Sequence, residues 1–376
     1  MFENKISFQS IARKPRGIVT INGISANFIK AQVNSTTNFL ADTFSLELPI
    51  SGQNPQLSQQ YFSSESAIMA QIYVGFPANV NNYTKDQLTS LIEGQVDEVE
   101  IDFVNRKYIL TGRDLTAKFI DNKTTNKFPN LTSSQIVQKF AKEQGLSSDV
   151  TPTNTLAGVY YAGDRAAMTA ELPEWDLITF LSQQENFIAY IEGTTLHFHP
   201  APSQNDTPYL IRYNQALNDG EAAYTSFNGI SLNAFRSLTV ARDVIVIVRS
   251  WNNASKKAFN VRVRRTPNKK TFLASQAQPI GDAQVYTYTK PGLSKEQALN
   301  LAQQYLREKS QHERKIEAEI IPDVSLKKTS VIKLSGTNTD FDQIYFTYSI
   351  NREITPTDFR MVIEAKNHSP NSEVIF

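Results

Sequence analysis

The chain has 376 residues, which is room for two or three domains because single hydrophobic cores stop growing below this length. Its 38 Lys and Arg residues balance 37 Asp and Glu residues, and this net charge of +1 gives no indication of binding to nucleic acid or to a membrane surface. The lack of cysteine excludes disulfides, thiolate metal sites and a cysteine nucleophile. The N-terminus is polar and the longest aliphatic run, residues 244–248, is too short to span a bilayer, so we expect no secretory signal, no membrane insertion and synthesis in the cytoplasm.

The first 113 residues predict a compact antiparallel β unit. Apolar and polar residues alternate as in half-buried strands, and an Asn-Gly pair or a proline ends several of the runs. The segments with these signals are residues 18–23, 44–49, 71–77, 91–99 and 108–111. Short strands with polar turns favour a barrel or a sandwich.

The last of these strands ends in the sequence Gly112, Arg113, Asp114. Gly112 indicates a backbone that needs either a positive φ or a close approach to another chain segment. We therefore expect Gly112→Val to destabilise the protein by about 1–3 kcal/mol. Asp114 is interpreted as a local capping or corner residue, so its replacement by alanine is expected to cost about 1 kcal/mol.

Helix signals begin after residue 113 and predict a small α/β module. In the first predicted helix Thr132 and Gln135 form a capping box, and Gly145 is a C-terminal stop. The second helix covers residues 175–185 and leads into a hairpin over residues 186–199 that turns at Glu192-Gly193.

A third helix begins with a second capping box at residues 294–297. It separates a predicted hairpin, residues 242–251 with 258–264, from the strands that we expect to pair with it. Those strands are residues 331–336, 344–350 and 359–365. This order indicates a second β unit that is interrupted by part of the α/β module.

Two histidines are the sequence's candidates for a metal site. His197 and His199 are two residues apart on a predicted strand, so both side chains point to one face and could bind a metal ion together. No further ligand lies near them in the sequence, whereas a structural site needs four. We therefore predict no metal site and interpret the pair as polar residues on a partly exposed hairpin face. His312 and His368 are isolated in polar segments.

A basic cluster lies in the second half of the chain: Arg262, Arg264, Arg265, Lys269 and Lys270. It could contact phosphate, but no aromatic stacking platform is interleaved and the whole chain is neutral. A solvated face or a contact with another subunit fits better, and we predict a partner contact at these five positions.

The usual catalytic motifs are missing from the sequence. There is no Walker-type phosphate loop, no Gly-x-Ser-x-Gly elbow and no His-Glu-x-x-His helix. We predict that the protein is not an enzyme, has no catalytic residues and requires no cofactor.

The order of these features resembles the baseplate hub proteins of contractile-tailed bacteriophages, the late control protein D and Mu-type hub family, and the hub portion of type VI secretion spike proteins. The segments that carry the resemblance are residues 41–46, 94–97, 110–121, 175–178, 187–196 and 334–337, with Tyr345. One departure is visible, because Asn351-Arg352 stands where many members place a histidine after the final tyrosine strand.

The resemblance implies a mainly β fold with an α/β insertion: two tail-tube-like antiparallel β-barrel domains and a discontinuous α/β module. The expected first barrel covers residues 1–113. The α/β module covers residues 114–228 and 267–308, and the second barrel covers residues 229–266 and 309–376.

The resemblance also implies a function. Such hubs are structural proteins of the virion, where three chains form a ring of six barrels in the tail baseplate. The ring joins the six-fold tail tube to the three-fold central spike and takes part in genome ejection. Its partners are the tube protein, the spike protein and other baseplate proteins, and no specific nucleic-acid binding is expected. The alternative is a tail-associated hydrolase or a carbohydrate-binding β protein. A cell-wall hydrolase in a hub chain would normally need a separate appended domain, whereas the hub pattern already occupies the chain.

Overall fold

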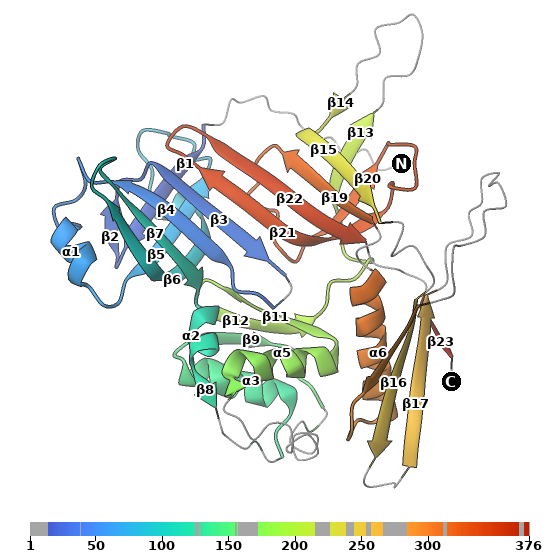
Figure 1. The fold of residues 1–376 in the computed structure, drawn as a ribbon. Coiled ribbons are helices and arrows are strands. Elements are labelled where there is room, and N and C mark those ends of the chain that lie inside the picture. Colours follow the sequence, from blue (N-terminus) through green and yellow to red (C-terminus); the bar gives the residue numbers. More distant parts are fainter. Residues whose placement is uncertain are drawn as a thin grey trace, which may run out of the picture.

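The computed structural model describes residues 14–37, 39–124, 128, 130–154, 156, 172–214, 226–237, 244–252, 257–265, 284–310, 314–367 and 372–375. Strands dominate these residues, and most of them belong to one large sheet that forms two β units, with two smaller layers beside it (Figure 1). The expected mainly β fold with an α/β insertion is therefore confirmed. Within the described residues no helix is long and apolar enough to cross a membrane.

The first β unit is antiparallel, with the strand order β3-β4-β7-β6-β5-β1-β2. Its elements are β1 (Arg16–Ile21), β2 (Ile24–Ala26), β3 (Lys30–Thr36), β4 (Thr43–Pro49), α1 (Gln59–Ser64), β5 (Met69–Gly75), a 3₁₀ turn (Lys85–Gln87), β6 (Thr89–Asp102) and β7 (Lys107–Asp114). The Asn-Gly signal is confirmed: Asn22 and Gly23 both have positive φ and turn β1 into β2.

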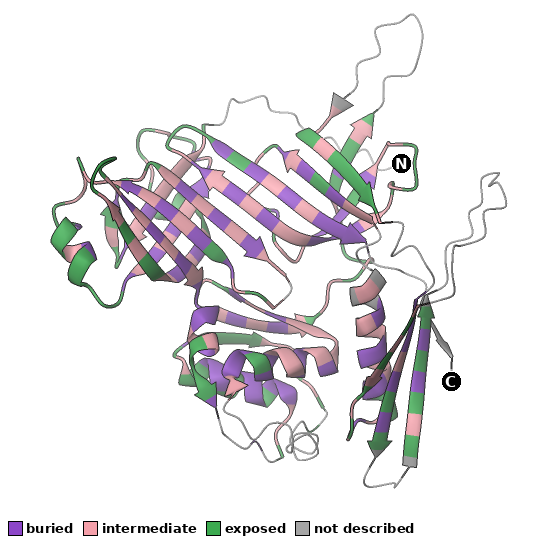
Figure 2. Ribbon diagram, in the orientation of Figure 1, coloured by how far each residue is buried: buried purple, intermediate pink, exposed green. Residues whose placement is uncertain are grey.

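Buried and more exposed residues alternate along these strands, as the sequence pattern predicted (Figure 2). On β4, for example, Phe44, Leu46 and Leu48 face the core while the residues between them do not. Each fully buried side chain of this kind contributes about 1.5–3 kcal/mol. The alternation therefore fixes which face of every strand turns inward.

The second β unit has the order β14-β13-β20-β21-β22-β19-β15. Its strands are β13 (Tyr209–Asn214), β14 (Ser226–Phe227), β15 (Gly229–Arg236), β19 (Arg314–Ile320), β20 (Val331–Ser335), β21 (Ile344–Ile354) and β22 (Phe359–Asn367). The pairing of β13 with β20 is parallel, whereas the others are antiparallel. Strand β13 thus belongs to this unit, although the sequence grouped it with the α/β module.

The two β units are joined edge to edge. Strand β3 pairs with β21 from Ala31 opposite Ile354 to Thr36 opposite Ser349, so a single sheet runs through both units. The resemblance implied two barrels, but the pairings of the described strands do not close a ring in either unit. At one edge of the first unit, β3 pairs with β21 of the second unit.

The α/β module lies against one side of this sheet (Figure 1). Its elements are α2 (Thr116–Asp121), β8 (Lys123–Thr124), α3 (Ser133–Glu143), β9 (Ser147–Val150), β10 (Leu172–Pro173), α5 (Glu174–Glu185), β11 (Phe187–Glu192) and β12 (Thr195–Pro200). Both helix signals hold: the Thr132 hydroxyl and the Gln135 side chain form the capping box, and Gly145 follows α3 with positive φ. The hairpin of β11 and β12 is also confirmed, with Gly193 at positive φ in its turn.

The remaining layer consists of β16 (Val244–Asn252), β17 (Lys257–Arg265), β18 (Gln284–Thr289), α6 (Lys295–Ser310) and β23 (Ser372–Ile375). The predicted hairpin exists as β16 and β17, but it pairs with β18 and β23 rather than with the second β unit. The physical reason is its apolar face: valines of β16 and β17 such as Val246 and Val261 pack against Ala298 and Leu306 of α6. The Ser294–Gln297 capping box starts this helix as predicted.

Candidate functional site

The corner that leads out of the first β unit is built around Gly112 on β7. Its φ is not in the positive region, and a Cβ atom there would overlap the Gln95 carbonyl oxygen and lie 2.6 Å from the Phe44 ring. Of the two explanations offered by the sequence, close approach is therefore the right one. Gly94 on the neighbouring strand β6 faces the same ring, so the two glycines together make room for Phe44.

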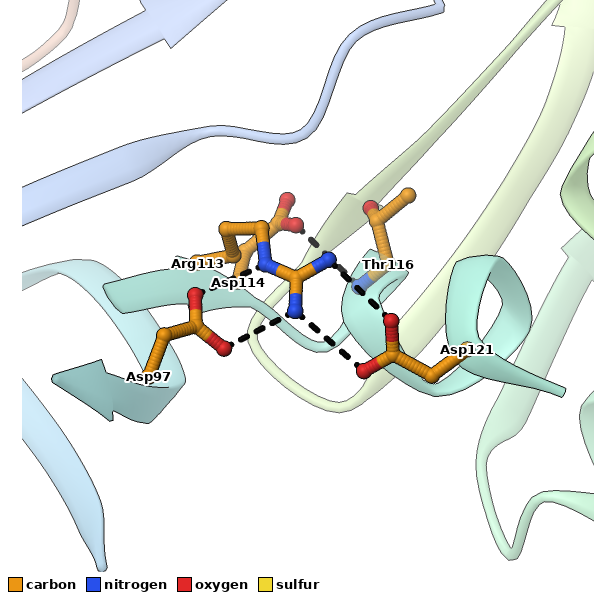
Figure 3. Close-up of polar contacts among 5 residues, drawn as sticks. All are labelled: Asp97, Arg113, Asp114, Thr116 and Asp121. Carbon is orange, nitrogen blue, oxygen red and sulfur yellow. Dashed lines mark hydrogen bonds and ion pairs between the residues drawn. The ribbon is translucent and has the colours of Figure 1, made fainter.

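Arg113 connects β6 to α2 by two bidentate contacts (Figure 3). Its Nε and Nη2 atoms donate to the Asp97 carboxylate at 2.7 and 2.8 Å. Its Nη1 and Nη2 atoms donate to the Asp121 carboxylate at 3.3 and 3.2 Å. Planar fork-to-carboxylate pairing of this kind fixes orientation as well as distance, so Arg113 sets the angle at which α2 leaves the sheet. We name Arg113, Asp97 and Asp121 the Arg113 corner.

The next residue, Asp114, is buried, with only 3% of its surface exposed. Its Oδ1 atom accepts a hydrogen bond of 3.1 Å from the Thr116 backbone N–H at the start of α2 (Figure 3). Its Oδ2 atom has no hydrogen-bond partner among the described residues. Burial, with a further contribution from the Asp42 carboxylate and opposed by Lys328, raises the pKa of Asp114 to about 7. Asp114 is thus more than the local corner residue that the sequence predicted.

Asp114 belongs to a group of four buried charged residues, which we name the junction cluster: Asp42, Asp114, Lys328 and Arg352. Lys328 Nζ lies 2.8 Å from Asp42 Oδ2, and both side chains are about nine-tenths buried. The other oxygen of Asp42 accepts from the Thr36 backbone N–H at 2.9 Å. This pair joins the β3–β4 connection of the first unit to the β19–β20 connection of the second.

Arg352 on β21 completes the junction cluster. Its Nη2 atom donates to the Leu326 carbonyl oxygen at 2.6 Å, and burial lowers its pKa to about 10. The α/β module contributes Tyr190 of β11, whose ring lies 5.2 Å below the Lys328 ammonium. Burial raises the pKa of the Tyr190 hydroxyl to about 12.

The junction cluster borders a cavity of about 80 Å³ lined by residues from both β units and from the α/β module. At its rim Lys327 Nζ contacts Glu192 of β11 at 2.7 Å, and both of these side chains are about half exposed. Lys328 and Asp42 form an ion pair between the two β units, and Lys327 and Glu192 form one between the second β unit and the α/β module. These contacts join the three units to one another.

The structure adds a third group to the two histidines of β12. Strand β9 runs parallel to β12, and this pairing places Asp149 opposite His197 and within reach of His199. No local pattern in the sequence indicates this contact, because Asp149 lies 48 residues before His197. Burial lowers the pKa of His197, against the opposing effect of nearby carboxylates.

The predicted partner contact lies partly within the described residues. Arg262 and Arg264 are exposed on one face of β17, while Val261 and Val263, which alternate with them, are buried against α6. The shared strand face of the two arginines is therefore confirmed. The backbone of Arg265 ends β17, and Lys269 and Lys270 lie outside the described residues. The contact itself stays a prediction.

No family profile and no curated protein matches the sequence. Solved structures do match. The tail protein from Neisseria meningitidis MC58 has a TM-score of 0.63 at 10% sequence identity, with 94% of this chain and 96% of that chain covered. The 43 kDa tail protein of prophage MuSo2 from Shewanella oneidensis has a TM-score of 0.60 at 12% identity, covering 93% and 97% of the two chains.

A third similar structure is an Escherichia coli protein described as a component of the type VI secretion system with structural similarity to the T4 bacteriophage tail proteins gp27 and gp5. Its TM-score is 0.52 at 9% identity, and 94% of this chain and 77% of that chain are covered. At such low identity the likeness shows the fold. The fold is that of phage tail proteins and of a type VI secretion component, and at this level the resemblance to the baseplate hub and spike family is confirmed.

Proposed function

We propose that this chain is a structural protein of a bacteriophage tail and, within the virion, the hub of its baseplate. Three copies form a ring of six β units, which joins the six-fold tail tube to the three-fold central spike. The partners are the tube protein, the spike protein and other baseplate proteins, and the ring remains open for genome ejection. The chain has no catalytic role in this proposal.

The observation that carries the proposal is the extent of the structural likeness. The matches to two phage tail proteins cover more than nine-tenths of this chain and of each of those chains. A single shared domain would leave one of the two chains largely unmatched. The likeness therefore supports a common architecture for the whole chain and not only a common β unit.

The seam between the β units supports the geometry of the proposed ring. The backbone pairing of β3 with β21 is flanked by an ion pair between Lys30 and Glu353 at 2.8 Å. A seam of backbone hydrogen bonds holds two β units side by side at a fixed spacing, because a shift would break the register of every pair. One chain thus supplies two positions of a six-fold arrangement, and three chains close it by symmetry.

Strand β15 at one end of the sheet is a suitable contact for the next copy. It pairs only with β19 among the described strands, and it carries the exposed apolar residues Ile230 and Phe235, with 66% and 42% of their surfaces exposed. Ile230 lies in a bulge of the β15–β19 ladder. Exposed apolar side chains on an unpaired edge are typical of subunit interfaces.

The solution mass of the purified chain tests the proposed trimer. Light scattering is expected to give the mass of three chains for the chain alone, or of three chains plus the bound spike protein after its addition. Ile230→Glu is expected to reduce the mass of the chain alone to that of one chain. Val104→Glu is the matched control, because Val104 is an apolar residue, 90% exposed, at the β6–β7 turn of the first β unit. A stable dimer in both conditions would contradict the proposal, and a monomer that degrades or binds cell-wall carbohydrate would favour the hydrolase or lectin alternative.

We place the basic cluster of Arg262, Arg264, Arg265, Lys269 and Lys270 at a contact with the tube or spike and not along the channel. A strongly basic channel wall would hold DNA phosphates through counterion release and slow their passage. Neutralising all five residues is expected to weaken co-assembly with tube or spike in pull-down assays while far-UV circular dichroism stays unchanged. Normal assembly combined with abnormal DNA ejection would place the cluster in the channel instead.

A further inference from the structure

The face of the β11-β12-β9 sheet that points away from α3 and α5 carries a compact group of nitrogen and oxygen ligands. Leu196 and Phe198 of β12 are buried in the core of the α/β module, so the alternate residues His197 and His199 lie on the opposite face. Asp149 of β9 lies on the same face, and more than half of its side chain is exposed. Solvent therefore reaches the group.

The distances suit a divalent transition-metal ion. Asp149 Oδ2 lies 3.2 Å from His197 Nδ1 and 3.1 Å from His199 Nε2, and the ligand atoms of all three residues lie within 4.8 Å of one another. Ligands at about 2.0–2.1 Å from a tetrahedral zinc ion are about 3.3 Å apart. Two of the three ligand-to-ligand edges are thus close to the required length before any metal enters.

Neighbouring side chains hold both imidazole rings in place. Thr151 Oγ1 lies 2.8 Å from His199 Nδ1, which leaves His199 Nε2 directed at Asp149. The backbone N–H of Thr151 donates to the Phe198 carbonyl oxygen at 2.9 Å, which holds the Thr151 main chain beside β12. The ring of Tyr190 stacks on His197 with 4.8 Å between centroids and 10° between planes. Such outer contacts orient the ligands of metal sites and strengthen binding.

We propose that Asp149, His197 and His199 form a zinc site with three protein ligands and a fourth position open to water. Two imidazoles and one carboxylate are a common zinc ligand set. The ion bridges β9 and β12, and it draws together a carboxylate and two imidazoles that otherwise only pair with one another. The site is independent of the proposed hub function, and its predicted effect is to stabilise the α/β module.

Calorimetric titration of the untagged full-length chain with zinc chloride, after removal of metal by chelator, tests the site. One zinc ion per chain is expected to bind, and the melting temperature is expected to rise with zinc concentration, since a ligand of the folded state stabilises it by mass action. Asp149→Asn and His199→Ala are each expected to weaken binding by at least about tenfold, and Thr151→Val by a smaller factor through loss of ring orientation. His312→Ala is the control histidine variant and should bind zinc as the parent does.

Cobalt as a probe adds a readout of geometry. Co²⁺ titrated into the same chain is expected to give the visible absorption of a four-coordinate ion, and this absorption should be absent in His199→Ala. Asp149→Asn keeps the size of the side chain, and unchanged far-UV circular dichroism would show that the module still folds. Zinc binding that is undetectable in the parent, or equally strong in parent and Asp149→Asn, would overturn the proposal.

Discussion

The junction cluster and the Arg113 corner both connect the first β unit to its neighbours by ion pairs, but they differ in their access to water. Lys328 and Asp42 at the junction are about nine-tenths buried, whereas the Arg113, Asp97 and Asp121 side chains are between about one-quarter and one-half exposed. Water screens the corner pairs, so breaking one costs little. At the junction a lost partner leaves a charge without solvent, so each residue depends on the others.

This difference indicates two separate tasks. The Arg113 corner contributes direction, because its forked contacts orient α2 where the chain leaves β7. The junction cluster contributes coupling, because its members come from both β units and line a cavity that the α/β module also borders. The proposed hub role requires the units to keep their relative positions, and buried charge pairs penalise separation strongly.

The largest expected effect is that of Lys328→Met. This change leaves Asp42 buried without its cation, and the free energy of unfolding is expected to fall by about 3–5 kcal/mol. Lys327→Met is the adjacent control, because its pair with Glu192 is about half exposed and should contribute less than about 1 kcal/mol. Denaturant titration measures both variants. Equal losses of stability in the two variants would mean that the buried Lys328–Asp42 pair contributes no more than the exposed Lys327–Glu192 pair.

The pH dependence of stability should report the raised pKa of Asp114 in the junction cluster. The folded protein holds a proton on Asp114 up to a pKa of about 7, whereas the unfolded chain loses it near 3.8. The stability that this group supplies is therefore fully present below about pH 4 and is lost as the pH rises to about 7. Asp114→Asn should remove this contribution. As the pH rises over that range, the stability of the variant relative to the parent should therefore increase by a few kcal/mol. Thermal melting of both proteins at several pH values measures this change. A constant difference across the range would contradict the assignment.

Gly112→Val tests the close approach of β7 to its neighbours and not an ion pair. The new side chain would overlap the Gln95 carbonyl and the Phe44 ring, which should cost about 1–3 kcal/mol. Thr111→Val, one position earlier on β7, adds no such overlap and is expected to change stability by less than about 0.5 kcal/mol. Similar melting temperatures for the two variants would contradict the close approach of Gly112 to the Gln95 carbonyl and the Phe44 ring.

The smallest effect is expected for Arg113→Gln. Its contacts with Asp97 and Asp121 are partly exposed, so the loss should be about 1 kcal/mol at low salt and should shrink as salt screens the parent's ion pairs. The effect of Lys328→Met should change much less between low and high salt, because buried pairs are screened less. If the loss of stability in Arg113→Gln did not depend on salt, the ion pairs of the Arg113 corner would be as poorly screened as those of the junction cluster, contrary to this account.

The signals that the sequence carried reliably are local ones. The Asn22-Gly23 hairpin, the Thr132–Gln135 capping box and the turn at Gly193 depend on residues within a few positions of one another, and all three are present. Alternation along β4 and β7 likewise predicted which residues are buried. Such features follow from backbone conformations and faces that short segments set for themselves.

The candidate sites depended instead on long-range pairing. Asp42 meets Lys328 across 286 residues, and Asp149 reaches the two histidines only because β9 runs parallel to β12. The β16–β17 hairpin was predicted correctly as an element, but its sheet was not, because a valine-rich strand pattern does not state which surface covers it. Periodicity identifies which face of a strand is buried, but it does not identify the element that packs against that face.

The rotational symmetry of the purified assembly tests the central claim most directly. Negative-stain images of the chain, alone or with the spike protein, are expected to yield class averages of a three-fold ring with six peripheral lobes around an open centre, one lobe for each β unit on the two sides of the β3–β21 seams. Particles with two-fold symmetry, or single chains in both preparations, would contradict the account.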